Sequence, residues 1–292
     1  MNALRRLPAV AALAALVAGG VACSPEDEAP PAAASPSASA SGTACAKASL
    51  NLVTPGTLTV GTDKPAFEPW FKANNPANGQ GFESAVAYAV ADKLGFGRSE
   101  VAWKTVPFNA SFAPGRKTFD FDINQISITP QRRKAVDFSS GYYTVTQAVI
   151  ALNSSKVADA TTIADLKGAK LAAQIGTTSL QAIQSTVRPT QQAAVYTDNN
   201  DVVTALKNGT VDAAVFDLPT AFFLTSTEIE DSKIVGQFPS PGEQVEQFGL
   251  LFEKGNPLVT CVNSAIAALR TGGDLARIQQ QWLAGAAAPE LK

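Results

Sequence analysis

Two adjacent arginines, Arg132 and Arg133, follow an apolar, strand-like run in the stretch "QISITPQRRKAVDFSSGYY". Thr129 suits a helix N-cap, because its hydroxyl can accept a free backbone N–H. Pro130 suits the first helical position, where its missing N–H has no cost. We therefore expect the arginines in the first turn of a short helix, just past the C-terminal end of a strand. A guanidinium at that place would bind an anion, most simply a carboxylate.

Adjacent helical residues point about 100° apart, so only one of the two arginines should face such a site. In open α/β sheets, ligands bind at the C-terminal ends of the strands, which favours a binding role. The alternative is a pair of solvated surface arginines, and the stretch by itself leaves both interpretations open.

The composition excludes several classes of function. The chain contains no histidine, which removes the commonest general base, the usual metal ligand and every His-containing catalytic triad. No CxxC, Walker-type loop or GxGxxG follows a strand, so neither a cofactor nor a metal is expected. A formal charge of −2 without a basic patch argues against a nucleic-acid partner.

The N-terminus is typical of a secretory signal, which we assign to residues 1–22. Arg5 and Arg6 precede an apolar run, Leu7 to Val17, that is too short to span a bilayer. Cys23 after "GGVA" resembles a lipoprotein cleavage site and would carry the lipid anchor; ordinary signal cleavage is the alternative. Residues 23–49 are rich in Ala, Ser and Pro and are predicted to be a disordered tether.

Two further cysteines flank the rest of the chain, and no later apolar run is long enough for a membrane span. Cys45 precedes the folded part and Cys261 lies near its end. Outside the cytoplasm a disulfide between them is permitted, and two unpaired thiols are the alternative.

Strands and helices alternate over the remaining 240 or so residues, which indicates an α/β fold with largely parallel sheets. A helix followed by a strand near an aspartate occurs twice, at 119–128 and 211–217, and implies two similar lobes. The strands are expected at 57–62, 100–106, 119–128, 144–152 and 248–257, with helices at 81–96, 258–269 and 274–283. A further helix should open at residues 177–179.

Five motifs in this order resemble the polar amino-acid-binding proteins of ABC importers, the extracellular solute-binding proteins of family 3. The motifs are "GTDKPAFEPW", "GFESAVAYAVADKLG", "SITPQRRKAVDFSSGYY", "DLKGAKLAAQIGTTS" and "NGTVDAAVFD". The resemblance implies a two-lobed periplasmic-binding-protein fold of type II, with two crossover hinge strands near 144–152 and 248–252. Lobe 1 would comprise residues 50–145 plus 249–292, and lobe 2 residues 146–248.

The resemblance also implies site residues. Arg132 would bind the ligand's α-carboxylate, helped by Thr178 from the second lobe, and Asp217 would accept its α-ammonium. A helix N-cap is the alternative for Asp217, and an ordinary core phenylalanine is the alternative for Phe108. The complete set of expected ligand-binding residues is Asp63, Phe67, Phe108, Gln125, Ser127, Arg132, Thr178 and Asp217.

The expected function is therefore to bind a polar or basic α-amino acid and deliver it to an ABC permease. We expect a monomeric, lipid-anchored binding protein outside the cytoplasm, without enzyme activity. Alternatives are an enzyme of the same fold, such as a cyclohexadienyl dehydratase using Glu68, Asp122 or Asp217, and a ligand-sensing surface lipoprotein. Asp122 stands where the family usually has an apolar strand residue. Asp63 with Glu68 suggests a cationic or amide ligand side chain.

Overall fold

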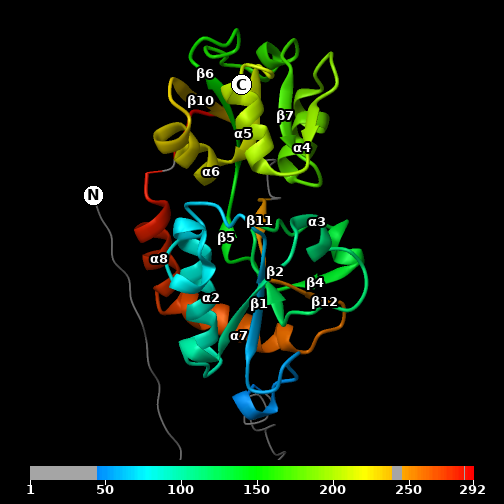
Figure 1. Cartoon of the computed structure of the whole chain (residues 1–292), viewed down its shortest axis with the longest axis vertical. Coiled ribbons are helices and arrows are strands. Elements are labelled where there is room, and N and C mark those ends of the chain that lie inside the picture. The colour runs from blue at the N-terminus through cyan, green and yellow to red at the C-terminus, as the bar shows by residue number, and fades with distance from the viewer. Residues whose placement is uncertain (1–44, 239–244, 286) are drawn as a thin grey trace, which may run out of the picture. The chain divides into compact units, whose positions relative to one another are not determined.

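The computed structural model describes residues 45–238, 245–285 and 287–292. Within these residues the chain forms two five-stranded sheets, each covered by helices (Figure 1). The first sheet has the strand order β2-β1-β3-β12-β4. Its strands are β1 (Leu58–Thr62), β2 (Val101–Thr105), β3 (Phe121–Asp122), β4 (Val136–Phe138) and β12 (Leu251–Glu253).

The first sheet is mixed rather than largely parallel. β1 pairs in parallel with β2 and β3, whereas β12, which returns from the second half of the chain, is antiparallel to β3 and β4. Large aromatic side chains fill the core between this sheet and its helices, and Trp70, Phe82 and Phe121 are fully buried. The helices of this half are α2 (Phe82–Lys93), α3 (Phe108–Ser111), α7 (Leu258–Thr271) and α8 (Asp274–Leu283).

The second sheet has the order β10-β6-β9-β7-β8. Its strands are β6 (Gln147–Leu152), β7 (Leu171–Gln174), β8 (Ala194–Tyr196), β9 (Ala213–Asp217) and β10 (Ser232–Gln237). β7, β8 and β9 run parallel, so their C-terminal ends meet at one edge. The helices are α4 (Thr178–Ala182), α5 (Asn199–Lys207) and α6 (Leu218–Phe223), and α4 and α6 continue as π-helices over Ile183–Val187 and Leu224–Glu228.

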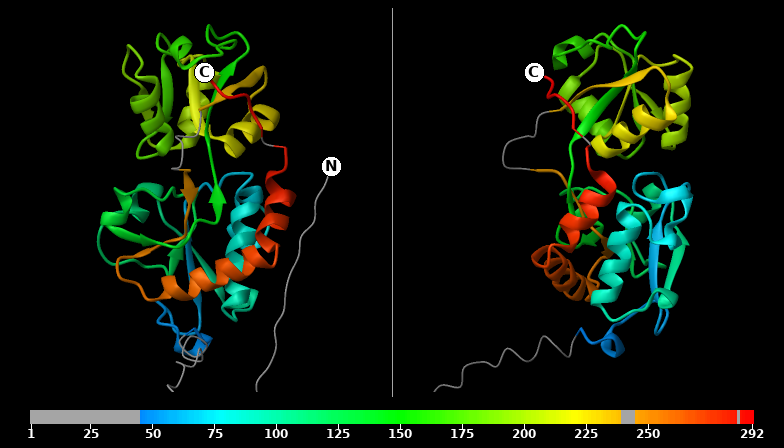
Figure 2. Two further views of the ribbon diagram at one scale, coloured as in Figure 1. Left: turned by 180° about the vertical axis from the view of Figure 1, so that it is seen from behind. Right: turned by 90° about the vertical axis from the view of Figure 1, so that its left-hand side faces the viewer.

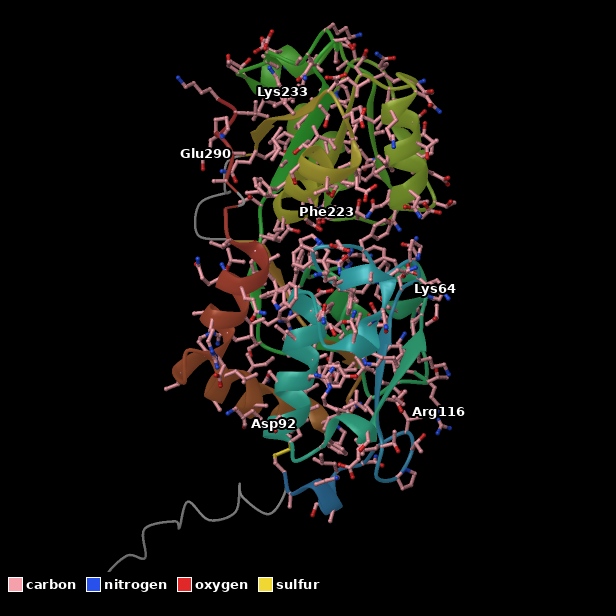
Figure 3. The ribbon with its side chains drawn as sticks, turned by 60° about the vertical axis from the view of Figure 1, so that its left-hand side comes forward. Lys64, Asp92, Arg116, Phe223, Lys233 and Glu290 are labelled. Carbon is pink, nitrogen blue, oxygen red and sulfur yellow. A yellow bond between two sulfur atoms is a disulfide. The ribbon has the colours of Figure 1, made fainter. Side chains whose placement is uncertain are left out.

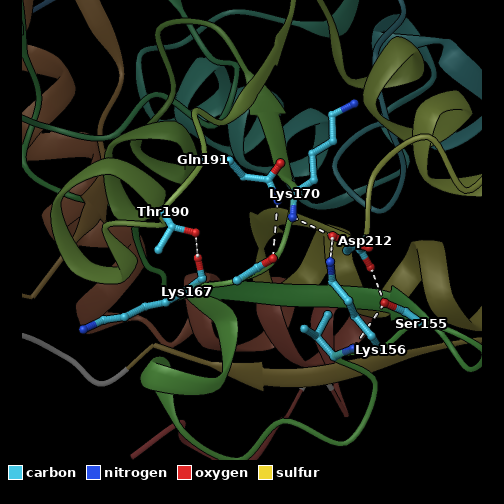
Figure 4. A network of polar contacts seen from close by, with 9 residues as sticks. Ser155, Lys156, Lys167, Lys170, Thr190, Gln191 and Asp212 are labelled. Atoms are coloured by element: carbon cyan, nitrogen blue, oxygen red, sulfur yellow. Dashed lines mark hydrogen bonds and ion pairs between the residues drawn. The ribbon is translucent and has the colours of Figure 1, made fainter.

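A polar network around Asp212 fixes the start of this parallel group (Figure 4). The Asp212 carboxylate accepts the backbone N–H of Lys170 at 2.6 Å and pairs with the Lys156 ammonium at 2.9 Å. Ser155 donates its hydroxyl to the Asp212 carbonyl at 2.7 Å. Lys170 precedes β7 and Asp212 precedes β9, so these contacts align the two strands whose opposite ends reach the cavity described below.

Two crossover strands connect the sheets, as predicted (Figure 2). β5 (Tyr143–Thr144) pairs antiparallel with β11 (Gln247–Phe248), with Tyr143 opposite Phe248. β5 leads directly into β6 of the second sheet, and β11 leads into β12 of the first. The two passages of the chain are therefore hydrogen-bonded to each other where a hinge is expected.

The C-terminal residues depart from the expected division of the chain. Residues 287–292 lie on the second sheet, where Glu290 bridges to Gln237, Leu291 is buried in the core and the Lys292 carbonyl accepts Ile163 N at 2.8 Å. Figure 3 labels Glu290 beside this half of the molecule. Lobe 1 was expected to run to residue 292. The sequence pattern does not show that the end of the chain packs on the second sheet, because Leu291 is a single apolar residue without a periodic pattern around it.

Cys45 and Cys261 form a disulfide, which confirms the predicted pairing over the two free thiols (Figure 3). Their Cα atoms are 5.4 Å apart, within the usual range for a disulfide. The bond ties the segment before the 3₁₀ helix Lys47–Ser49 to α7. It closes a loop of 216 residues and lies in the first half of the molecule, next to the core of the first sheet.

Two local predictions are wrong in detail. Of the predicted strand 119–128, only Phe121–Asp122 forms a strand, and further along Gln125 takes a left-handed backbone with φ of 47°, which turns the chain. The arginines lie in a 3₁₀ helix, Arg132–Lys134, that begins after Gln131 rather than at Pro130. Thr129 still acts in the expected way, since its hydroxyl accepts Arg132 N at 3.1 Å. Among the described helices, none combines the length and apolar character needed to cross a bilayer.

Candidate functional site

One cavity is lined by elements of both sheets. Seven of the eight residues predicted to bind a ligand lie in its wall. The eighth, Ser127, is buried directly behind it and bonds to its lining. The lining residues are Asp63, Lys64, Pro65, Phe67, Phe108, Asn124, Gln125, Arg132, Gln174, Thr177, Thr178, Ser179, Asp198, Asn199 and Asp217.

Arg132 is the buried cation of this cavity, with 8% of its surface exposed, whereas Arg133 is exposed to solvent. Its guanidinium donates to the Ser127 carbonyl at 2.7 Å and to the Gly176 carbonyl at 2.9 Å, so it binds backbone from both halves. The rings of Phe108 and Phe112 lie 5.4 and 4.7 Å from its central carbon. Burial lowers the pKa of Arg132 to about 10, against the opposing charges of Glu246 and Asp217, and the side chain stays cationic at neutral pH.

Gly176 allows the second half to approach Arg132 this closely. Its φ is +79°, and a Cβ there would lie 2.1 Å from the Asn109 side-chain oxygen. Two residues on, Thr178 opens α4, with Thr177 as N-cap accepting Leu180 N at 3.1 Å. The Thr178 hydroxyl lies 3.3 Å from the Ser127 hydroxyl. The two halves therefore meet beside Arg132 through a hydroxyl pair and a charge-assisted bond to backbone.

Asp217 is the acid of the second half that lines the same cavity as Arg132. It ends β9 and occupies the N-cap position of α6, but its side chain makes no capping bond. One carboxylate oxygen instead accepts Gln147 Nε2 at 2.7 Å. Burial, aided by the nearby charge of Glu246, raises the pKa of Asp217 to about 8.

Gln125 is held in the cavity floor by Glu83, the second residue of α2. The Glu83 carboxylate accepts the Gln125 backbone N–H at 2.7 Å, and it also accepts the Gln125 side-chain amide and the Tyr142 hydroxyl. The two hydrogen bonds from Gln125 to Glu83 offset the strain of a non-glycine residue at positive φ. Glu83 is fully buried, and burial raises its pKa to about 7 despite the three hydrogen bonds.

The remaining wall combines aromatic rings with acids from both halves. Asp63 follows β1 and accepts Lys64 N at 2.7 Å and Phe108 N at 3.1 Å. Burial raises its pKa, with a smaller contribution from the negative charge of Asp198. Asp198 caps α5 by accepting Asp201 N at 3.0 Å. Phe67 and Phe108 line the same space, so this end of the cavity offers flat apolar faces beside two carboxylates.

Several residues that line the cavity were not predicted from the sequence. Gln174 ends β7, while Asp198 and Asn199 follow β8, so they lie where ligands bind in parallel sheets. The three-residue β8 has too short a pattern to be predicted as a strand, so no site residues were expected at its C-terminal end. Gln147 and Glu246 were also missed, although both contact predicted site residues.

Asp122 and Glu68 do not line this cavity. Asp122 is fully buried in β3 beside Gly61, whose missing side chain makes room for it, since a Cβ there would be 2.4 Å from Asp122 Oδ2. Neither carboxyl oxygen has a hydrogen-bond partner among the described residues. Burial, aided by the nearby charges of Glu83 and Asp63, raises the pKa of Asp122 well above its usual range. Glu68 instead accepts Ala73 N at 3.1 Å.

The site is thus a cleft between two α/β halves joined by paired crossover strands, with the Arg132 guanidinium and the Asp217 carboxyl group lining one cavity. Within the described residues, no group of three or more potential metal-binding side chains is present. This architecture is that of the type II periplasmic binding proteins, which the structural neighbours share.

The sequence pattern of bacterial extracellular solute-binding proteins, family 3, matches residues 58–285, and the chain belongs to this family. It is 26% identical over 213 residues to the arginine-binding extracellular protein ArtP of Bacillus subtilis (strain 168), covering 70% of this chain and 78% of that protein.

Two solved structures are similar over 78% of this chain. An ancestral arginine-binding protein bound to arginine has a TM-score of 0.64, 30% identity and 98% of its own length covered. The ancestral amino acid-binding protein AncCDT-1, described as a precursor of cyclohexadienyl dehydratase, has a TM-score of 0.64, 27% identity and 95% of its length covered. These relatives are described as binding proteins rather than enzymes.

Proposed function

We propose that this protein binds an α-amino acid with a cationic side chain in the cavity and delivers it to an ABC permease. The observation that carries the proposal is that buried Arg132 and Asp217 both line one cavity. A zwitterion needs a fixed cation and a fixed anion, and a planar guanidinium can donate hydrogen bonds to both oxygens of a carboxylate. Thr178, which lines the cavity, would add a hydroxyl donor to the same carboxylate, whereas the Ser127 hydroxyl already donates to Glu246.

The cationic side chain follows from the rest of the wall. Asp63 and Asp198 approach from opposite halves, and the aromatic faces of Phe67 and Phe108 can hold the apolar stem of a long side chain. The amides of Gln125, Gln174 and Asn199 supply further polar contacts. Similarity to arginine-binding proteins supports the same class of ligand.

A thermal-shift screen of the twenty amino acids tests this function. A ligand present at 100 times its Kd adds about 2.7 kcal/mol of stability, which corresponds to a rise in Tm of about 5–10 °C for a chain of this size. L-arginine and L-lysine should give the largest shifts. A protein stabilised by none of the twenty would contradict the proposal.

Binding without turnover is the second part of the proposal. Of the three acids that sequence reasoning offered for catalysis, only Asp217 lines the cavity. An acid that accepts an ammonium suffices for capture, whereas proton transfer in a dehydratase needs a group placed at the reacting carbon. Incubation with prephenate or arogenate should leave both compounds unchanged.

The proposed anchor lies outside the described residues, at Cys23. We expect lipid on this cysteine, with the monomeric binding domain held outside the cytoplasm by the tether. Cys23→Ser should move the protein from the membrane fraction to the soluble fraction. An unchanged membrane fraction would contradict the anchor without affecting the ligand site.

A further inference from the structure

Glu246 lies at the hinge, immediately before β11, and its backbone is fixed by both crossover strands. Its carbonyl accepts Val145 N at 3.0 Å, and the next residue, Gln247, accepts Ile128 N at 2.8 Å. Phe248 bridges to Ser127. These contacts aim the Glu246 side chain at Ser127, whose hydroxyl donates to the carboxylate at 2.6 Å.

Gln147 connects Glu246 with Asp217. Its Nε2 donates to Asp217 Oδ1 at 2.7 Å and lies 3.3 Å from each oxygen of Glu246. On the other side of the amide, Ser179 donates its hydroxyl to Gln147 Oε1 at 2.6 Å. Carboxylates only accept hydrogen bonds, so this arrangement directs the amide NH₂ toward both acids. Gln147 and Ser179 are both buried, which keeps the bridge out of bulk water.

Among the described residues, Gln147 is the side-chain donor to the Asp217 carboxylate, whereas Glu246 also accepts the Ser127 hydroxyl. An amide NH₂ has two hydrogens, but three carboxylate oxygens and the Thr178 hydroxyl lie within 3.3 Å of this nitrogen. Within the described residues neither acid takes part in an ion pair. Arg132 is the nearby cation, and its guanidinium bonds to backbone carbonyls.

The other groups around Asp217 do not supply positive charge. Glu83 in α2 adds a negative charge when ionised, and it acts on the pKa of Asp217 in the same direction as Glu246. Tyr142 and Tyr143, next to the first crossover, have raised pKa values, mainly because they are buried, and stay neutral. Burying two like charges this close is unfavourable unless one is neutralised or a cation is bound between them.

We propose that Asp217, held beside Glu246 by the Gln147 bridge, carries a proton when the cavity is free of ligand, and that this proton passes to solvent when the ammonium group of an amino acid binds Asp217. The bound ammonium then supplies the positive charge that ionised Asp217 lacks in the free protein. Glu246 is thus a positioning residue that acts on the ligand through Gln147 and Asp217. The inference rests on the proposed function and adds a proton linkage to it.

The thermodynamic linkage between proton release and ligand binding determines whether affinity rises or falls with pH. Where the free protein holds one more proton than the complex, affinity rises about tenfold for each unit of pH. Affinity for an amino acid should therefore increase from pH 6 to pH 7.5 and level off above about pH 8, where Asp217 of the free protein has already lost its proton. Glu246→Gln leaves one acid beside a neutral amide, so Asp217 ionises at lower pH and the dependence flattens.

Isothermal titration calorimetry with L-arginine tests the inference. Titrations at pH 6.5 in buffers with different ionisation enthalpies count the protons released for each L-arginine bound. The wild-type protein should release close to one, and Glu246→Gln less than about half. Glu230→Gln is the matched control, because it removes the same charge from an exposed position outside the site, and it should release as many protons as wild type.

The possible outcomes distinguish a failure of the proton linkage from a failure of the proposed binding function. Binding of L-arginine with heats that do not depend on the buffer overturns the proton linkage and leaves the binding function standing. Equal proton release by wild type and Glu246→Gln, at every pH from 6 to 8, assigns the proton elsewhere and overturns the role of Glu246. Absence of binding by any of the twenty amino acids overturns the proposed function and the linkage with it.

Discussion

Arg132 and Asp217 carry opposite charges into one cavity, but their surroundings differ. The Arg132 guanidinium donates to two backbone carbonyls, one from each half of the molecule, and lies against two aromatic rings. Its partners are backbone atoms, so its position is fixed before any ligand arrives. It remains charged at neutral pH, since its pKa stays near 10.

Asp217 has a poorer supply of hydrogen-bond partners. Its carboxylate shares one donor, Gln147 Nε2, with Glu246, which also accepts the Ser127 hydroxyl. Its pKa is raised to about 8, mainly by burial, so the ionised form is disfavoured near neutral pH. This end of the cavity acquires a full charge partner only when a cation enters.

The two ends should therefore contribute to binding in different ways. The arginine end is preorganised and also helps to hold the two halves together, so its loss should weaken both the contact with the ligand and the contact between the halves. The aspartate end is completed by the ligand, so its loss should remove one interaction and the pH dependence of binding.

Arg132→Ala should cause the largest loss of affinity. Truncating one member of a buried charge pair costs about 2–5 kcal/mol, or roughly 30- to 4,000-fold in Kd. Arg132→Lys should also weaken binding, because an ammonium cannot reproduce the two-pronged contact with a carboxylate. Calorimetry with L-arginine measures both changes. Arg133→Ala is the control and should bind normally; a harmful Arg133→Ala with a silent Arg132→Ala would contradict the assignment.

Asp217→Asn should weaken binding less. Asparagine keeps one acceptor and nearly the same shape, so the change removes a charged hydrogen bond worth about 1.5–3 kcal/mol, or about 10- to 150-fold in Kd. The remaining affinity should no longer rise between pH 6 and pH 7.5. Asp92→Asn, on the exposed face of α2, is the control (Figure 3). A variant that retained the wild-type pH profile would show that Asp217 is not the titrating acid.

The arginine end could be predicted from sequence because its information is local. Thr129 and Pro130 mark the turn, and helical geometry predicts that only one of the two arginines faces a site; the resemblance to family 3 is what identified that arginine as Arg132. α8 was expected at its observed bounds, Asp274–Leu283, for the same reason: an amphipathic pattern between a glycine pair and a loop.

The aspartate end could be predicted only in part. Asp217 follows a clear strand, but Gln147 is 70 residues away and Glu246 lies in the second crossover, 99 residues from Gln147. Only the pairing of β5 with β11 brings them together, and two-residue strands leave no periodic pattern. Gln125 was expected within a strand, because nothing in the local sequence reports the Glu83 carboxylate that turns it.

Stability should also distinguish the two ends, because only the acidic side titrates near neutral pH. Glu83 and Asp217 have folded-state pKa values of about 7 and about 8, above their ordinary values of 4.5 and 3.8. The native state therefore binds more protons than the unfolded state between pH 4 and pH 8. The stability is fully present below the ordinary values and is lost as the pH rises through the raised ones.

The free energy of unfolding without ligand should therefore fall from pH 5 to pH 8, as measured by urea denaturation. L-arginine should reduce the slope, because its ammonium favours ionised Asp217. Glu83→Gln should reduce the slope even without ligand, whereas the exposed Glu230→Gln should leave it unchanged. Stability that rose over this range would contradict the assignment of both acids.

Asp63→Asn should have the smallest effect and should depend on the ligand. Asp63 is half-buried and already accepts two backbone N–H groups, so part of its charge is compensated before a ligand arrives. An ion pair in such a position is worth up to about 1 kcal/mol, or about fivefold in Kd. The loss should appear with L-arginine and nearly vanish with L-glutamine, whose side chain is neutral. Glu68→Gln is the control, since Glu68 points to Ala73 rather than to the cavity. Equal losses for the two ligands would show that Asp63 acts through the Phe108 backbone rather than on the ligand side chain.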